Sequence, residues 1–210
     1  MRTFCKTAFP ASAILLFAMF APATAAPLTV VNVDGETVSC DFNITCEVVA
    51  TDTFGKYPPS SGYTGHPKLW TRTFQGGPGS LGDGLNAFEY QADFTHAHAA
   101  TDINCAVDVT IKTGPIKRLN YDGSGKADIY VITTGGTGTI GLASAVRNGA
   151  HVTFTFTTPV CPENGTAPGQ LSFYFGFASP NAPVARHAQS SLTFGGGTVN
   201  VKARVPAPPG

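Results

Sequence analysis

Residues 151–158 read HVTFTFTT, and their alternation of apolar and polar side chains decides the fold class. Val152, Phe154 and Phe156 occupy every second position, with histidine or threonine between them. Successive side chains of a β-strand point to opposite faces, so the stretch predicts a strand with one buried and one solvated face. That pattern is typical of antiparallel sheets.

The same alternation recurs along the chain. It is clear in residues 105–112 (CAVDVTIK), 171–179 (LSFYFGFAS) and 198–205 (TVNVKARV). Further strands are expected to begin at Leu28, Thr37, Ile44, Lys68, Ala87 and Ala127. Glycine-containing turns separate them, and one short helical turn is expected within residues 141–149. These features predict an all-β fold, an antiparallel two-sheet sandwich of jelly-roll-like type, with a barrel as the alternative.

The N-terminus has the pattern of a signal peptide. Arg2 and Lys6 precede an apolar stretch at residues 11–20, and small residues follow up to Ala25. The apolar stretch is too short to span a bilayer, so residues 1–25 are expected to be cleaved. We expect a secreted or periplasmic protein with a single β-sandwich domain at 26–205 and a flexible tail at 206–210.

Four cysteines remain after such a cleavage: Cys40, Cys46, Cys105 and Cys161. An even number of cysteines in an exported chain indicates disulfides rather than a metal site. Three pairings are open. Cys40–Cys46 with Cys105–Cys161 is favoured, because the first pair brackets a short loop and the second constrains a long stretch of chain.

Charge is sparse and balanced, with 13 basic and 13 acidic residues in the full chain. Removal of Arg2 and Lys6 with the signal peptide leaves the rest slightly acidic. Nucleic-acid binding needs a basic patch or stripe, so nucleic acid is not an expected partner. No later stretch has the length of apolar sequence that a membrane span requires.

A polar stretch at residues 120–128, NYDGSGKAD, has the spacing of a calcium loop. Oxygen ligands would come from Asn120, Asp122, Ser124 and Asp128 and from the backbone carbonyl of Lys126, with a glycine at the sharp turn. It resembles the loops of FG-GAP repeats and dockerin-like modules. The resemblance implies a bound Ca²⁺ with a structural role.

The loop departs from that pattern in ways that lower its charge. Two carboxylates remain, and Val131 stands where an EF-hand has its bidentate glutamate. Binding is therefore expected to be weak, about 10⁻⁴ to 10⁻³ M. The alternative is a polar hairpin connection in which Asp122-Gly123 forms the turn. Both interpretations of the loop stay open.

In overall style, without a defining motif, the whole chain resembles secreted bacterial β-sandwich proteins of unassigned function.

Aromatic residues gather in the stretch 54–70. Tyr57, Tyr63 and Trp70 are the candidate ligand-binding residues, because exposed aromatic rings stack against sugars. The same rings could instead cover one end of the core.

Three functions follow, in order of preference. The first is a secreted, non-catalytic module with a structural or adhesive role, calcium-stabilised if the loop binds metal, with a cell-surface component or carbohydrate as partner. The second is a carbohydrate-binding module. The third is a secreted hydrolase, for which no nucleophile elbow or zinc motif was found and no catalytic residue is named.

Overall fold

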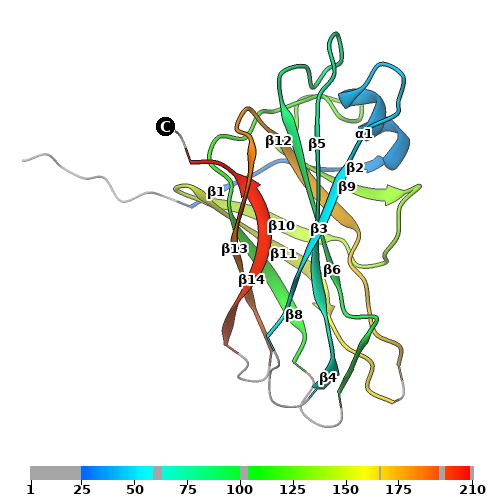
Figure 1. The fold of residues 1–210 in the computed structure, drawn as a ribbon, viewed down its shortest axis with the longest axis vertical. Helices are drawn as coiled ribbons and strands as arrows, with labels where there is room; N and C mark the ends of the chain where they lie inside the picture. The colour runs from blue at the N-terminus through cyan, green and yellow to red at the C-terminus, as the bar shows by residue number, and fades with distance from the viewer. Residues whose placement is uncertain (1–24, 59–62, 100–103, 166, 194–196, 209–210) are drawn as a thin grey trace, which may run out of the picture.

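Two six-stranded β-sheets pack face to face in the computed structural model (Figure 1), which describes residues 25–58, 63–99, 104–165, 167–193 and 197–208. Sheet A has the strand order β1 (Ala26–Pro27), β10 (Leu142–Asn148), β11 (His151–Val160), β8 (Ala106–Lys112), β13 (Pro183–Ser191) and β14 (Thr198–Pro206). Sheet B has the order β2 (Val30–Asp34), β9 (Ile129–Thr134), β12 (Tyr174–Ser179), β6 (Asn86–Asp93), β5 (Lys68–Gln75) and β3 (Thr51–Lys56). The short strands β4 (Tyr63–Gly65) and β7 (Ala97–Ala99) pair with each other.

The expected all-β, two-sheet architecture is thus confirmed, with one refinement. Strands β2 and β9 pair in parallel, whereas the other pairs of named strands are antiparallel.

Residues 1–24 of the expected signal peptide lie outside the described residues. Among those described, no helix is long and apolar enough to cross a bilayer.

Aromatic side chains dominate the core between the sheets. Phe88 stacks on Phe177 with ring centroids 5.6 Å apart, and Phe154 of sheet A meets Phe175 of sheet B at 5.0 Å. All four are buried. Burial of one such side chain stabilises the fold by about 1.5–3 kcal/mol. The alternation of apolar and polar residues therefore determines which face of a strand turns toward the core.

A second, smaller core lies on the outer face of sheet B, beneath helix α1 (Gly35–Phe42). Val38 and Phe42 are buried there, and the Phe42 ring meets Phe74 at 5.3 Å. Figure 1 shows the helix at one end of the sandwich, beside β2. The prediction of a strand from Thr37 was wrong: the Asp34 side chain accepts a 2.8 Å hydrogen bond from the backbone of Glu36 and so caps a helix.

Three other segments differ from expectation. Residues 141–149, expected as a helical turn, mostly form β10 because their apolar side chains face the sheet core. The strand expected from Ile44 does not form, and Ile44 and Val49 are 70% and 93% exposed. Strand β14 extends to Pro206, and the backbone N–H of Ala207 donates to Ala182, so the ordered chain passes the expected tail boundary.

Both disulfides favoured by the sequence are present. Cys40–Cys46 ties the last turn of α1 to the segment that follows it. Cys105–Cys161 joins the residue before β8 to the residue after β11, two neighbouring strands of sheet A.

The two sheets approach each other closely where β3 meets β14. A Cβ atom on Gly55 would collide with the backbone of Lys202, so only glycine permits this approach. The contact fixes β3 at the edge of sheet B, and with it the outward-facing side chains of Asp52 and Phe54.

Candidate functional site

The outer face of sheet B carries a line of polar residues that crosses its strands. In register, Asp52 of β3 is opposite Arg72 of β5, which is opposite Glu89 of β6. Glu89 is opposite Gly176 of β12, which is opposite Tyr130 of β9. We call these five residues the charged row.

Gly176 allows its two neighbours in this row, Glu89 and Tyr130, to meet. The Tyr130 hydroxyl donates a 3.2 Å hydrogen bond to Oε1 of Glu89, although a strand lies between them. A Cβ atom on Gly176 would lie 2.8 Å from that hydroxyl and would block its path. A glycine in the middle of a strand therefore serves the close approach of another group.

Glu89 is a carboxyl group held in the protein interior. It is only 2% exposed, and this burial raises its pKa from 4.5 to about 7. The charge of Arg72 and the hydrogen bond from Tyr130 act in the opposite direction and limit the rise. Glu89 therefore changes charge near neutral pH, a property frequent in functional sites.

Arg72 is held in place by two neighbours. Its Nε and Nη2 donate to the two carboxylate oxygens of Asp52 at 2.9 and 3.3 Å. Its guanidinium carbon lies 4.9 Å from the ring centroid of Tyr174. The hydrogen bond to Asp52 is the largest cause of a raised Arg72 pKa, and the planar guanidinium stays oriented across the face.

A pocket of about 570 Å³ opens above the charged row. Arg72, Glu89 and Tyr174 form part of its floor, and α1 with the loop at residues 135–137 forms part of its wall. Its size is in the range of small-molecule sites.

A second line of residues beside the charged row carries three aromatic rings, with Gln91 of β6 opposite Trp70 in the same line. Phe54 is opposite Trp70, and their ring centroids are 5.1 Å apart. Tyr174 projects from the same face of the sheet, as its contact with Arg72 shows. Phe54 is 46% exposed, and Trp70 and Tyr174 are half-buried. We call Phe54, Trp70 and Tyr174 the aromatic row.

Polar groups surround these rings. Nζ of Lys68 lies 5.0 Å from the Phe54 ring centroid and 5.2 Å from that of Trp70. The indole Nε1 of Trp70 donates to Asp93 at 3.0 Å and thereby fixes the ring. The combination is an oriented aromatic surface with a cation at its edge.

The ligand-binding residues expected from sequence separate in the structure. Trp70 lies in the aromatic row, as a ligand platform requires. Tyr57 does not, because it is only 2% exposed and packs on Phe94 in the inter-sheet core. Tyr63 lies in β4, and its side chain is not among those that the structure describes.

The loop at 120–128 is closed by a bridge between Leu119 and Ala127. Oδ1 of Asn120 accepts from the backbone of Gly125 at 2.9 Å, and Asp122 accepts from the backbone and hydroxyl of Ser124. These are the hydrogen bonds of a polar turn.

The remaining two expected calcium ligands are engaged outside the loop. The Lys126 carbonyl accepts from Arg118, and Asp128 accepts from the backbone of Thr29 at 3.0 Å. Among the described residues, no group of three or more histidine, cysteine, aspartate or glutamate side chains is placed to hold a metal ion. Calcium binding at this loop stays a prediction.

Arg72, Glu89 and Tyr174 were missed by sequence reasoning. Glu89 alternates with Phe88 and Tyr90 and so has the pattern of a solvent-facing residue. Gln91 and Asp93 continue the same alternation, so no signal in the sequence set Glu89 apart. Comparisons with protein-family models, curated proteins and solved structures give no match to this chain.

Proposed function

We propose that this chain is an exported, non-catalytic carbohydrate-binding module that binds neutral sugars on the outer face of sheet B. The aromatic row is the observation that carries the proposal. Phe54, Trp70 and Tyr174 lie on one sheet face with their rings partly open to solvent. The carbon-bound hydrogens of a sugar ring form an apolar face that packs on such rings.

The charged row adds the polar half of the recognition. Hydroxyl groups of a bound sugar need hydrogen-bond partners, and Arg72, Asp52 and the pocket beside them supply fixed donors and acceptors. Arg72 is already oriented by Asp52, so little conformational entropy is lost on binding. Export through the expected signal peptide would bring the module to extracellular or periplasmic glycans, consistent with an adhesive role.

The test uses the single tryptophan of the chain as its probe. Neutral gluco-, manno- and galacto-oligosaccharides are titrated into the mature protein, and Trp70 fluorescence is recorded. Phe54→Ala should weaken binding by about tenfold, the usual effect of removing an aromatic anchor. Trp70→Ala should abolish binding measured by calorimetry.

Leu81→Ala is the matched control. Leu81 is 48% exposed but lies in the loop between β5 and β6, outside the aromatic row. Its loss should leave sugar affinity unchanged. Absence of both quenching and heat with every oligosaccharide, or equal weakening by Leu81→Ala, would refute the proposal.

One observation favours hydrolysis as a second candidate function. Glu89 has a pKa of about 7 beside a pocket, as a general acid requires. Incubation of a bound oligosaccharide followed by a reducing-end assay separates the two functions. A non-catalytic module releases no reducing ends, whereas a hydrolase releases them and loses that activity in Glu89→Gln.

A further inference from the structure

Sheet A carries a different chemistry around β8 and β13, two strands that pair with each other. Lys112 of β8 is in register with His151 of β11. Arg186 and His187 come from β13, which pairs with β8. Together these four residues line one cleft of about 330 Å³, which we call the basic cleft.

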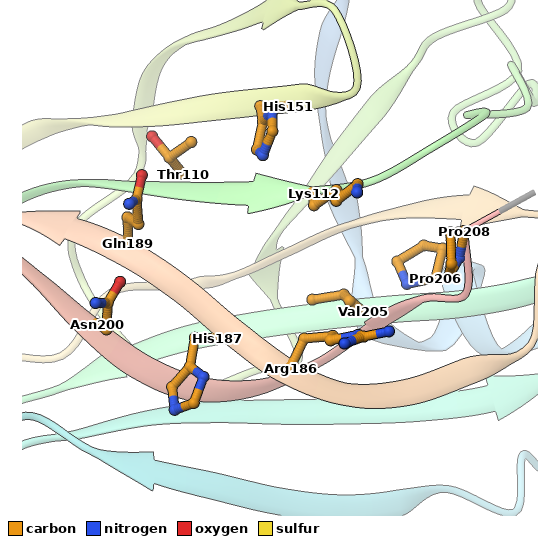
Figure 2. Close-up of a pocket in the computed structure, with 10 residues that line it drawn as sticks. All are labelled: Thr110, Lys112, His151, Arg186, His187, Gln189, Asn200, Val205, Pro206 and Pro208. Atoms are coloured by element: carbon orange, nitrogen blue, oxygen red, sulfur yellow. The ribbon is translucent and has the colours of Figure 1, made fainter.

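Figure 2 shows how the side chains of the basic cleft are disposed. Lys112 and Arg186 extend in the same direction, toward Pro206 and Pro208 at the end of β14. Thr110, Gln189 and Asn200 lie on the other side of the cleft. The cleft thus has a cationic end and an end of hydroxyl and amide groups.

The cationic groups have no compensating acid. The cleft is lined by no aspartate or glutamate among the described residues. Within the same described part of the chain, neither Lys112 nor Arg186 forms an ion pair. Asp108 of β8 is itself engaged, because its Oδ1 accepts a 3.1 Å hydrogen bond from the backbone of Ser191.

An unpaired lysine and arginine in a concave site attract an anion, since the cleft focuses their field. The neighbouring polar groups come from three strands in register, because Thr110 is opposite Gln189 and Gln189 is opposite Asn200. Amide and hydroxyl groups of this kind exchange hydrogen bonds with sugar hydroxyls. Thr110, Gln189 and Asn200 thus extend the cleft along sheet A.

Other anionic partners fit less well. Single-stranded nucleic acid is bound by aromatic side chains that stack on bases, and no aromatic ring other than histidine lines the basic cleft among the described residues. A membrane surface needs apolar side chains that insert among lipids, and no large exposed apolar side chain lines the cleft in the described part of the chain.

We propose that the basic cleft binds an acidic polysaccharide, with a carboxylate or sulfate group held by Lys112 and Arg186 and ring hydroxyls held by Thr110, Gln189 and Asn200. The site is independent of the aromatic row on sheet B. A module with both sites would link acidic and neutral glycans across its thickness.

The experiment measures binding of the mature protein to polygalacturonate, which carries carboxylates, and to dextran sulfate, which carries sulfates. Lys112→Gln combined with Arg186→Gln should weaken binding by about tenfold or more, as expected for loss of two charge-assisted contacts. Binding should also weaken as salt is raised. The two polymers distinguish the source of the anionic group.

Lys117→Gln combined with Lys126→Gln is the matched control. Both lysines are exposed and neither lines the basic cleft. The control removes two positive charges, as the Lys112→Gln and Arg186→Gln pair does, so the net charge of the two variants is the same. This variant should keep its affinity. Trp70→Ala should also keep it, which separates this site from the sugar site of sheet B.

Three results would overturn the proposal. The first is no binding of either acidic polymer at low salt. The second is equal weakening by the control pair, which would show that net charge alone drives binding. The third is competition by free inorganic sulfate as strong as that by dextran sulfate, which would reduce the cleft to a simple anion site.

Discussion

At the scale of single residues, Glu89 has the least ordinary environment. Strand β6 is buried on both faces, so a carboxyl group in its middle loses almost all contact with water. The Tyr130 hydroxyl and the charge of Arg72 replace only part of that hydration. Ionisation of a buried acid of this kind destabilises the fold relative to its protonated form.

This environment predicts a pH dependence of stability. The pKa of Glu89 is raised from 4.5 to about 7, so the folded state binds a proton more tightly than the unfolded state. The free energy of unfolding should therefore fall as pH rises from about 4.5 to above 7. In Glu89→Gln this fall should be smaller by roughly 3 kcal/mol, the equivalent of the shift.

Urea unfolding at several pH values between 4.5 and 8 checks this prediction. Asp41, whose pKa burial raises to about 6, adds a change of the same sign that both proteins share. Glu47→Gln is the control, since Glu47 is exposed. An unchanged pH dependence in Glu89→Gln would contradict the burial account.

At the scale of elements, period-two alternation identified the long strands because apolar residues at every second position form the face that packs between the two sheets. It failed at α1, where Val38, Cys40 and Phe42 also alternate. Val38 and Phe42 are also four residues apart, which is the spacing of residues on one face of a helix. The N-cap formed by Asp34 decides in favour of the helix. Trp70 could be found from its residue type. The charged row could not, because it depends on which strands become neighbours.

The loop at 120–128 yields an element-scale prediction. Asp122 accepts hydrogen bonds from Ser124, and these lower the pKa of its carboxyl group. If the loop is a polar turn, Asp122→Ala should lower the Tm equally in calcium and in EDTA, since the turn is lost in both. A calcium-dependent rise in Tm of the parent protein that Asp122→Ala abolishes would instead establish a metal loop.

At the scale of the whole molecule, the sandwich separates its surfaces. The aromatic row lies on the outer face of sheet B, whereas residues of sheet A line the basic cleft. The core of buried aromatic residues lies between the two sheets. This separation fits the two glycan sites that we propose, because they share no residue.

The disulfides stabilise this arrangement to different extents. Cys105–Cys161 closes a loop with a sequence separation of 56, whereas Cys40–Cys46 closes one of 6. The chain-entropy account gives about 4 kcal/mol for the long loop and about 2 kcal/mol for the short one. Replacement of each pair by alanine should lower the free energy of unfolding in that order, measured by urea unfolding. The two variants are matched controls for each other, because each removes two cysteines. An equal loss, or a larger loss for Cys40→Ala with Cys46→Ala, would show that α1 matters more to stability than constraint of the unfolded chain.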